Sequence, residues 1–193
     1  MTPDEDFRTQ LLELIPHMRA FARSLCGDRE LADDLSQDTL ERALKAQASF
    51  TLGTNLKAWV FMILRNQFYS YKRRSWRTTE LDPDVAQQTL VAVTNPTGAL
   101  ELDELRRALS MLPDEQREAL ILIGAGGFSY DEASQIMGVA AGTIKSRVSR
   151  ARDRLALIYA EGLIDSDGRD PQQAMASLML AATRYAASMR SAA

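Results

Sequence analysis

Cysteine and histidine are nearly absent from this sequence. Cys26 and His17 are the single examples of each among 193 residues. One thiol cannot form an internal disulfide or an all-cysteine zinc site, and one imidazole excludes a His-rich metal site and disfavours a histidine-based catalytic triad. Acidic pairs such as Asp33–Asp34 occur without an accompanying nucleophile. We therefore expect no metal, no other cofactor and no enzymatic activity, and we interpret Cys26 and His17 as structural residues.

Long apolar runs are also missing. No segment approaches the 18 uncharged apolar residues of a membrane-spanning helix, and the acidic residues at 4–6 do not resemble a signal peptide. Hydrophobic residues make up 46% of the chain and charged residues 25%, a balance that supports folded domains rather than disorder. We expect a cytoplasmic protein that does not associate with a membrane.

A large net charge is lacking too, but the charges are unevenly distributed. There are 23 basic and 26 acidic residues, so the formal net charge is −3. Residues 49–79 carry basic side chains and no acid, and residues 143–154 carry five basic side chains against one acid. The acids gather in residues 28–41 and 80–104. Separate basic and acidic blocks suggest two kinds of partner, one of them a nucleic acid.

The apolar spacing is helical throughout and predicts an all-α protein. Residues 78–99 lose this spacing and gather proline, glycine and threonine, which predicts a flexible linker. We expect four domain segments: a helical domain at 5–77, the linker at 78–99, a second helical domain at 100–160, and a tail at 161–193. Helices are expected at 5–15, 16–25, 28–48, 55–74, 100–111, 113–124, 129–138 and 142–160. On the third of these the predicted inner side carries Leu31, Leu35, Leu40 and Leu44.

The second domain contains a helix-turn-helix pattern. Ser129 and Glu132 form a capping box before a short helix that ends at Gly138, and a longer basic helix follows. On this helix the predicted buried stripe is Ile144, Val148, Ala151 and Leu155. Opposite it project Ser146, Ser149 and Arg150, flanked by Lys145, Arg147, Arg152 and Arg154. Short polar side chains with basic flanks suit insertion into a major groove, where Arg150 could contact a guanine; the alternative is an ordinary solvated basic face.

The fourth helix, 55–74, mixes aromatic and basic side chains. Its aromatic residues include Trp59, Phe68 and Tyr69, and Arg65 and Lys72–Arg74 lie among them. Aromatic rings stack on unpaired bases while cations follow the backbone, so this composition favours single-stranded or melting DNA. Trp59 and Phe68 are expected to be core residues.

Two segments resemble a known family. ADDLSQDTLERAL (32–44) followed by LKAWVFMILRNQFYSYKRR (56–74) is similar to region 2 of bacterial sigma factors, and LPDEQREALILIGAGGFSYDEASQIMGVAAGTIKSRVSRARDRL (112–155) is similar to region 4. Their order and spacing resemble the extracytoplasmic-function class. IPHMRAFARSLCGD (15–28) and residues 126–148 further resemble its general-stress-response subgroup.

The resemblance implies a protein that binds core RNA polymerase and promoter DNA, recognises the −35 and −10 elements, and helps to open the duplex. It also implies a partner that inhibits it, a small helical anti-sigma factor of the NepR type. By position, the polymerase contacts would be Asp34, Leu35, Gln37 and Asp38. The −10 contacts would be Phe50, Arg65, Asn66, Tyr69, Lys72, Arg73 and Arg74. The −35 contacts would be Thr143, Lys145, Ser146, Arg147, Ser149, Arg150, Arg152 and Arg154.

Two other functions are compatible with parts of the sequence. A stand-alone helix-turn-helix regulator would bind duplex DNA without polymerase, but it gives no reason for the aromatic and basic fourth helix. A sigma mimic would bind an anti-sigma factor without binding DNA, and the basic recognition helix disfavours it. The tail from Pro171 has the pattern of an amphipathic helix that either shields a binding surface or is a loosely ordered terminus.

Overall fold

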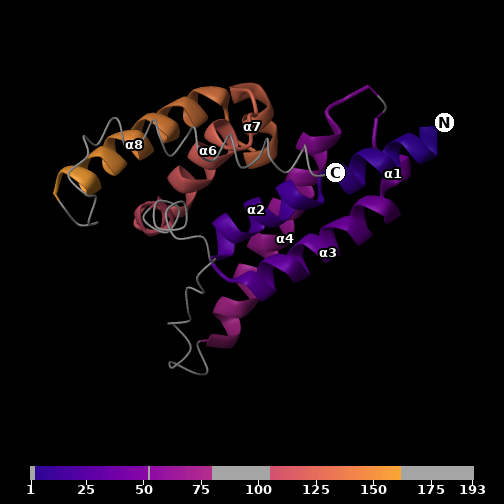
Figure 1. The fold of residues 1–193 in the computed structure, drawn as a ribbon, viewed down its shortest axis with the longest axis horizontal. Helices are drawn as coiled ribbons and strands as arrows, with labels where there is room; N and C mark the ends of the chain where they lie inside the picture. The colour runs from indigo at the N-terminus through magenta and orange to yellow at the C-terminus, as the bar shows by residue number, and fades with distance from the viewer. Residues whose placement is uncertain (1–2, 52, 80–104, 162–193) are drawn as a thin grey trace, which may run out of the picture. The chain divides into compact units, whose positions relative to one another are not determined.

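The structure is a computed structural model that describes residues 3–51, 53–79 and 105–161 (Figure 1). All regular secondary structure within these residues is helical, which confirms the predicted all-α class. The chain divides into two compact units, one of which takes in residues up to Leu90 and the other nearly all of the remainder. We call the described parts, residues 3–79 and 105–161, the N-terminal and C-terminal units. Most of the predicted linker and the predicted tail helix lie outside the described residues.

Among the helices of the described residues, none combines the length and the apolar character that crossing a membrane would demand.

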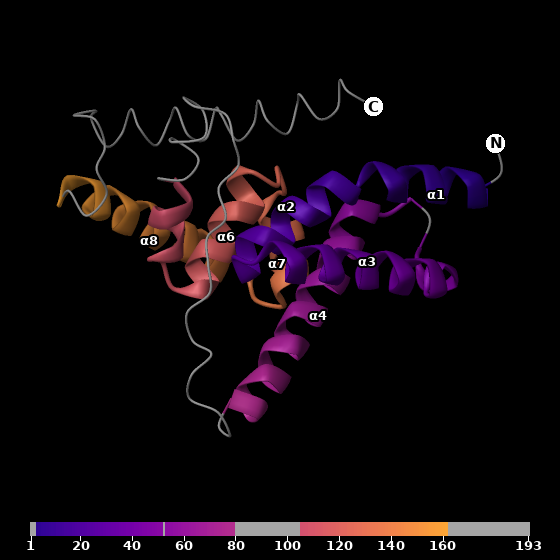
Figure 2. The same ribbon diagram turned by 60° about the horizontal axis from the view of Figure 1, so that its bottom comes forward.

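The N-terminal unit consists of four α-helices and one short 3₁₀-helix. These are α1 (Pro3–Glu13), α2 (Ile15–Cys26), α3 (Arg29–Lys45), η1 (Gln47–Ser49) and α4 (Leu56–Thr79). Both α2 and α4 pack against α3, and the C-terminal end of α4 extends beyond them (Figure 2). Helix α4 continues past Arg74, its expected end, into the first two residues of the predicted linker.

The boundary between α2 and α3 forms as the sequence predicts. Gly27 has a φ of 74°, a left-handed conformation that favours glycine, and its N–H donates to the carbonyl of Arg23. Asp28 then accepts a hydrogen bond from the N–H of Leu31 at 2.8 Å and so caps α3. This cap fixes where α3 begins.

The buried face of α3 differs from the expected row of leucines. Besides Leu35, this face consists of small side chains, Ala32, Ser36, Thr39 and Ala43. The hydroxyls of Ser36 and Thr39 each donate, at 2.7 Å, to a carbonyl four residues earlier, so their polar atoms are satisfied inside the core. Small side chains let α3 pack closely on α2 and α4. The larger side chains of Leu31 and Leu40 lie off this face and are only partly covered, and Leu44 is 46% exposed.

The C-terminal unit begins with a helical segment at 105–110. It continues with α6 (Asp114–Gly124), α7 (Tyr130–Met137) and α8 (Ala141–Ala160). Helix α6 packs along α8, and Leu122 on α6 and Leu155 on α8 are almost completely buried. Pro113 precedes α6, and Asp114 and Glu115 occupy its first turn, where the helix dipole favours acids.

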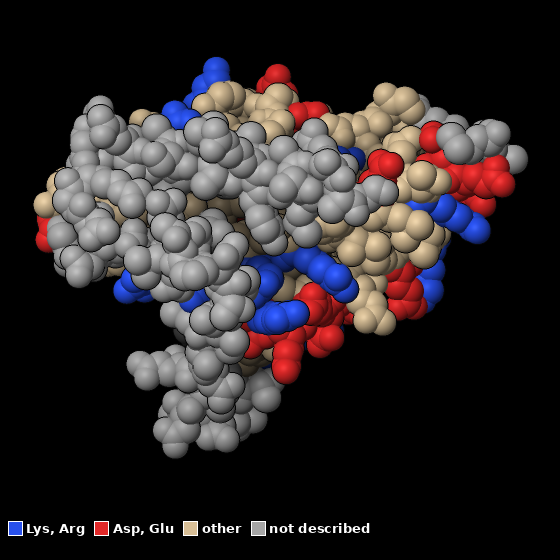
Figure 3. All heavy atoms as spheres, in the orientation of Figure 1, with Lys and Arg blue, Asp and Glu red and all other residues tan. Residues whose placement is uncertain are grey.

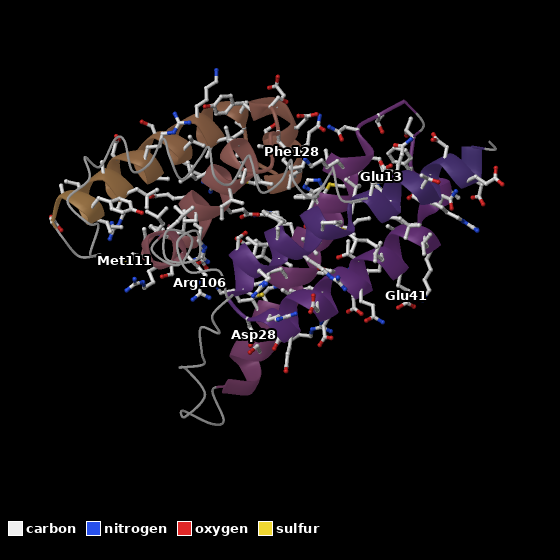
Figure 4. The ribbon with its side chains drawn as sticks, viewed as in Figure 1. Glu13, Asp28, Glu41, Arg106, Met111 and Phe128 are labelled. Atoms are coloured by element: carbon white, nitrogen blue, oxygen red, sulfur yellow. The ribbon has the colours of Figure 1, made fainter. Side chains whose placement is uncertain are left out.

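The turn between α6 and α7 depends on a glycine for steric reasons. A Cβ atom at Gly126 would lie 2.6 Å from the carbonyl oxygen of Leu122 and 2.8 Å from the Phe128 ring. Phe128, labelled in Figure 4, is buried here, and its N–H donates to the Leu122 carbonyl at 3.1 Å. Gly126 therefore belongs to a turn that a larger residue would disrupt.

The capping box of α7 is confirmed. The N–H of Ser129 donates to the Glu132 carboxylate at 2.7 Å, and the N–H of Glu132 donates to the Ser129 hydroxyl oxygen at 3.2 Å. Gly138, with a φ of 66°, ends the helix and turns the chain into α8.

Candidate nucleic-acid interface

Helix α8 buries the stripe that its sequence predicts. Ile144, Val148, Ala151 and Leu155 are each no more than 1% exposed. Their spacing puts them on one side of the helix at about 100° per residue. Because these residues face the core, the opposite side of α8 faces solvent.

The solvent side of α8 carries short polar side chains and one arginine. Ser149 and Arg150 are exposed, while Ser146 is half-buried and its hydroxyl donates to the Thr143 carbonyl at 2.9 Å. Short side chains let a helix backbone approach base edges, and an arginine can contact a guanine with two hydrogen bonds. The exposed acid Asp153 follows on the same side, so the face suited to DNA is the N-terminal half of α8.

Among the basic residues on the flanks of α8, two contact other helices of the unit. The Lys145 ammonium lies 5.6 Å from the centre of the Tyr130 ring on α7, and Arg147 forms an ion pair with Glu115 on α6. Arg152 and Arg154 are exposed. Sequence spacing predicted the same role for all four cations. It did not identify Glu115 as a partner of Arg147, because the two residues are 32 positions apart.

The C-terminal half of α4 presents the second basic surface. Asn66 and Lys72–Arg74 are exposed, whereas Phe68 is buried as expected. The Arg65 guanidinium lies 4.5 Å from the centre of the Tyr69 ring, and both side chains are half-buried. This cation–π contact orients Tyr69 beside the exposed cations, an arrangement that can combine stacking with backbone attraction.

Phe50 lies in an aromatic cluster that joins three parts of the N-terminal unit. Its ring centre is 5.8 Å from that of Phe7 on α1 and 5.3 Å from that of Trp59 on α4. The side chains of Gln47 and Asp4 are also hydrogen-bonded, which ties η1 to α1. Phe50 and Trp59 are both half-buried, so Trp59 is less enclosed than expected. The cluster holds the loop before α4 against the first helix.

An acidic face lies on the outward side of α3. Asp34, Gln37 and Asp38 are exposed, and Figure 3 shows acidic side chains gathered along this helix. Leu35 is only 5% exposed. Its side chain therefore lies mainly inside the unit, and its role as a polymerase contact stays a prediction.

Leu44 is an exposed residue that the sequence reasoning assigned to the core. It follows Gln37 by about two helical turns and so shares its side of α3. Glu41, labelled in Figure 4, lies between them and forms an ion pair with Lys45. The Lys45 ammonium lowers the pKa of the Glu41 carboxyl. We define the α3 docking face as Asp34, Gln37, Asp38 and Leu44.

Metal-ligating side chains do not cluster in the part of the chain that the structure describes. The Cys26 thiol donates to the carbonyls of Ala22 and Asp28 at 3.0 and 3.2 Å, and burial raises its pKa. Both observations fit a structural cysteine.

Comparison with known proteins identifies the family to which both units belong. Residues 11–78 match the family model of Sigma-70 region 2, and residues 102–155 match that of Sigma-70 region 4. The two units are thus the promoter-recognition modules of the sigma-70 class.

Individual relatives show which group of sigma factors this chain resembles. The extracytoplasmic-function (ECF) RNA polymerase sigma factor EcfG of Rhodopseudomonas palustris (strain TIE-1) is 49% identical over 173 residues, 89% of this chain and 95% of the relative. SigM of Bacillus subtilis (strain 168), also an ECF sigma factor, is 34% identical over 86% of this chain and 99% of its own. The Bartonella quintana sigma factor RpoE, solved in complex with the anti-sigma factor NepR, matches with a TM-score of 0.76 at 48% identity, over 84% of this chain and 99% of that one.

This chain belongs to the ECF RNA polymerase sigma factors. Its function is to bind core RNA polymerase and direct promoter-specific initiation of transcription through the −35 and −10 elements. The family consists of transcription factors rather than enzymes.

Proposed function

We propose that this sigma factor directs a stress regulon from the cytoplasm and that three surfaces divide its work. The α3 docking face would bind polymerase, the exposed end of α4 with Asn66 would bind the −10 element, and the N-terminal half of α8 would read the −35 element. We also propose the predicted segments 5–77, 78–99 and 100–160 as the functional domains. The identity to EcfG supports the assignment to stress.

The observation that carries the proposal is the orientation of α8. A fully buried stripe on one side leaves Ser149 and Arg150 on the other, with exposed cations beside them. Base-edge contacts from the centre and phosphate contacts from the flanks are what a recognition helix supplies in the major groove.

Binding to a promoter fragment tests the proposal against its alternatives. The fragment would carry −35 and −10 elements, and the gel shift would compare core polymerase alone, this protein alone, and both together in the presence of a polyanion competitor. A competitor-resistant complex that needs both components is expected. A shift by the protein alone would instead indicate a stand-alone regulator, and no promoter complex in any mixture would indicate a sigma mimic.

We further propose regulation by a small helical anti-sigma factor, because the RpoE match was solved with NepR. Such a partner would compete with polymerase for the α3 docking face, where Leu44 offers an apolar contact beside the acids. Titrating a NepR-type protein into the reconstituted holoenzyme should release this chain from core polymerase, as followed by size-exclusion chromatography. A holoenzyme that remains intact at saturating anti-sigma factor would refute this part of the proposal.

A further inference from the structure

The ion pair between Glu115 and Arg147 joins two helices of the C-terminal unit. Glu115 lies in the first turn of α6, and Arg147 lies on α8. The Arg147 side chain is only 15% exposed, whereas that of Glu115 is 66% exposed. The stem of the arginine is therefore packed within the unit, and its charged end meets an accessible carboxylate.

We propose that Glu115 is a positioning residue that holds Arg147 away from DNA. Recognition of the −35 element would then use one phosphate-directed cation fewer than the basic pattern of α8 suggests. This inference rests on the proposed role of α8. The carboxylate both cancels the charge of the guanidinium and ties it to α6, so Arg147 cannot reach a phosphate without breaking the pair.

The neighbouring cations of α8 are in a different situation. Lys145 lies over the ring of Tyr130, but the ring is neutral and leaves the ammonium charge intact. Arg150 and Arg152 are exposed on the solvent side and on a flank. The carboxylate at Glu115 therefore acts selectively on one of the cations in this half of the helix.

Salt dependence separates a neutralised arginine from one that contacts a phosphate. Each phosphate contact adds about 0.9 to the slope of log affinity against log salt. A released Arg147 would add up to one such contact, which corresponds to about 3.5-fold more affinity lost between about 50 and about 200 mM salt. Because phosphates are present in every sequence, the release should strengthen binding to unrelated DNA as well and reduce specificity.

The test uses holoenzyme reconstituted with core polymerase and a short duplex that carries only a −35 element, with a scrambled duplex for comparison. Fluorescence anisotropy across this salt range would follow E115Q, R147A, the E115Q/R147A double variant, and R152A as the control for a phosphate contact. E115Q should steepen the slope by about 0.9, the double variant should restore it, R147A should leave it unchanged, and R152A should make it shallower by about 0.9. Either an unchanged slope in E115Q or a shallower slope in R147A overturns the proposal.

R150A distinguishes this inference from the proposed function. If R150A leaves discrimination between the −35 and scrambled duplexes unchanged, the role of α8 itself is wrong. If R150A removes discrimination and E115Q does not alter the slope, only the role of Glu115 is wrong. Thermal unfolding of each variant, with E115A as a second replacement, verifies that the unit remains folded.

Discussion

Arg150 and Arg152 lie two residues apart on α8 but point in different directions. Arg150 points away from the buried stripe and Arg152 lies on its flank, since two residues on a helix differ by about 200°. Both side chains are exposed. Under the proposed function, Arg150 would contact a base edge and Arg152 would contact the sugar-phosphate backbone.

Arg150→Ala is expected to cost about 1–3 kcal/mol of binding and to relax preference at one position of the −35 element. Arg152→Ala should weaken binding by a similar factor on every sequence and reduce the salt slope. Holoenzyme affinities for promoters substituted at each −35 position measure both effects. A uniform loss in Arg150→Ala would reassign that residue to backbone contact.

Gly126 and Gly142 provide a matched pair for stability. Gly126→Ala should destabilise the C-terminal unit by about 1–3 kcal/mol, because its Cβ would overlap the Leu122 carbonyl and the Phe128 ring. A Cβ at Gly142, in the first turn of α8, meets nothing within 4 Å, so Gly142→Ala should be neutral or stabilising by up to about 1 kcal/mol. Urea unfolding of the full chain measures both, and equal midpoints for the two variants would contradict the steric argument.

At the scale of the element, the two sides of α3 have different roles. One side is buried in the core of the N-terminal unit, and the other is the proposed binding surface. Leu35 and the small residues around it are buried against α2 and α4, whereas Asp34, Gln37, Asp38 and Leu44 face solvent. No residue of the α3 docking face is part of the buried stripe. Substitutions on the two sides should therefore have different consequences.

Leu44→Ser should weaken binding to core polymerase by about 1 kcal/mol or more, roughly fivefold, with stability changed by no more than about 0.5 kcal/mol. Leu35→Ala should instead lower stability by about 2–5 kcal/mol. Co-purification with core enzyme and thermal unfolding measure the two properties. As a control, Glu13→Ser on α1 (Figure 4) should alter neither, and a Leu44→Ser variant that binds normally would remove Leu44 from the docking face.

Local patterns predicted most of these elements, and interactions between distant residues account for the differences. The caps of α3 and α7 and the buried stripe of α8 depend on neighbours within one or two turns, so the sequence indicates them directly. The leucines of α3 were assigned to the core by hydrophobicity alone, whereas close helix packing selects small side chains there. The partner of Arg147 comes from another helix, and no local spacing indicates it.

At the scale of the whole molecule, the two proposed DNA-binding surfaces belong to separate compact units. The basic end of α4 is in the N-terminal unit, and α8 is in the C-terminal unit. The acids of α3 lie in the same unit as α4 but on a different helix, so the proposed polymerase contact and the proposed DNA-binding cations are on separate helices. This separation explains how a chain with a small net charge could bind partners of opposite charge.

Asn66→Ala and Arg150→Ala should act independently on promoter binding, because they lie in different units and contact different promoter elements. Their free-energy costs should add to within about 0.5 kcal/mol in the double variant. A double-mutant cycle on holoenzyme affinity for the complete promoter measures the coupling. A coupling energy well above this value would mean that the −10 and −35 surfaces read the promoter as one body.

The surroundings of the half-buried Cys26 bear on how this residue would respond to an oxidant. Its thiol is the only one in the sequence, both of its hydrogen bonds go to backbone carbonyls, and its raised pKa leaves little thiolate to react with peroxide. Cys26 is therefore expected to be a poor target for peroxide. Under the proposed function, activity would then depend on how much of the chain the anti-sigma factor holds and how much core polymerase holds.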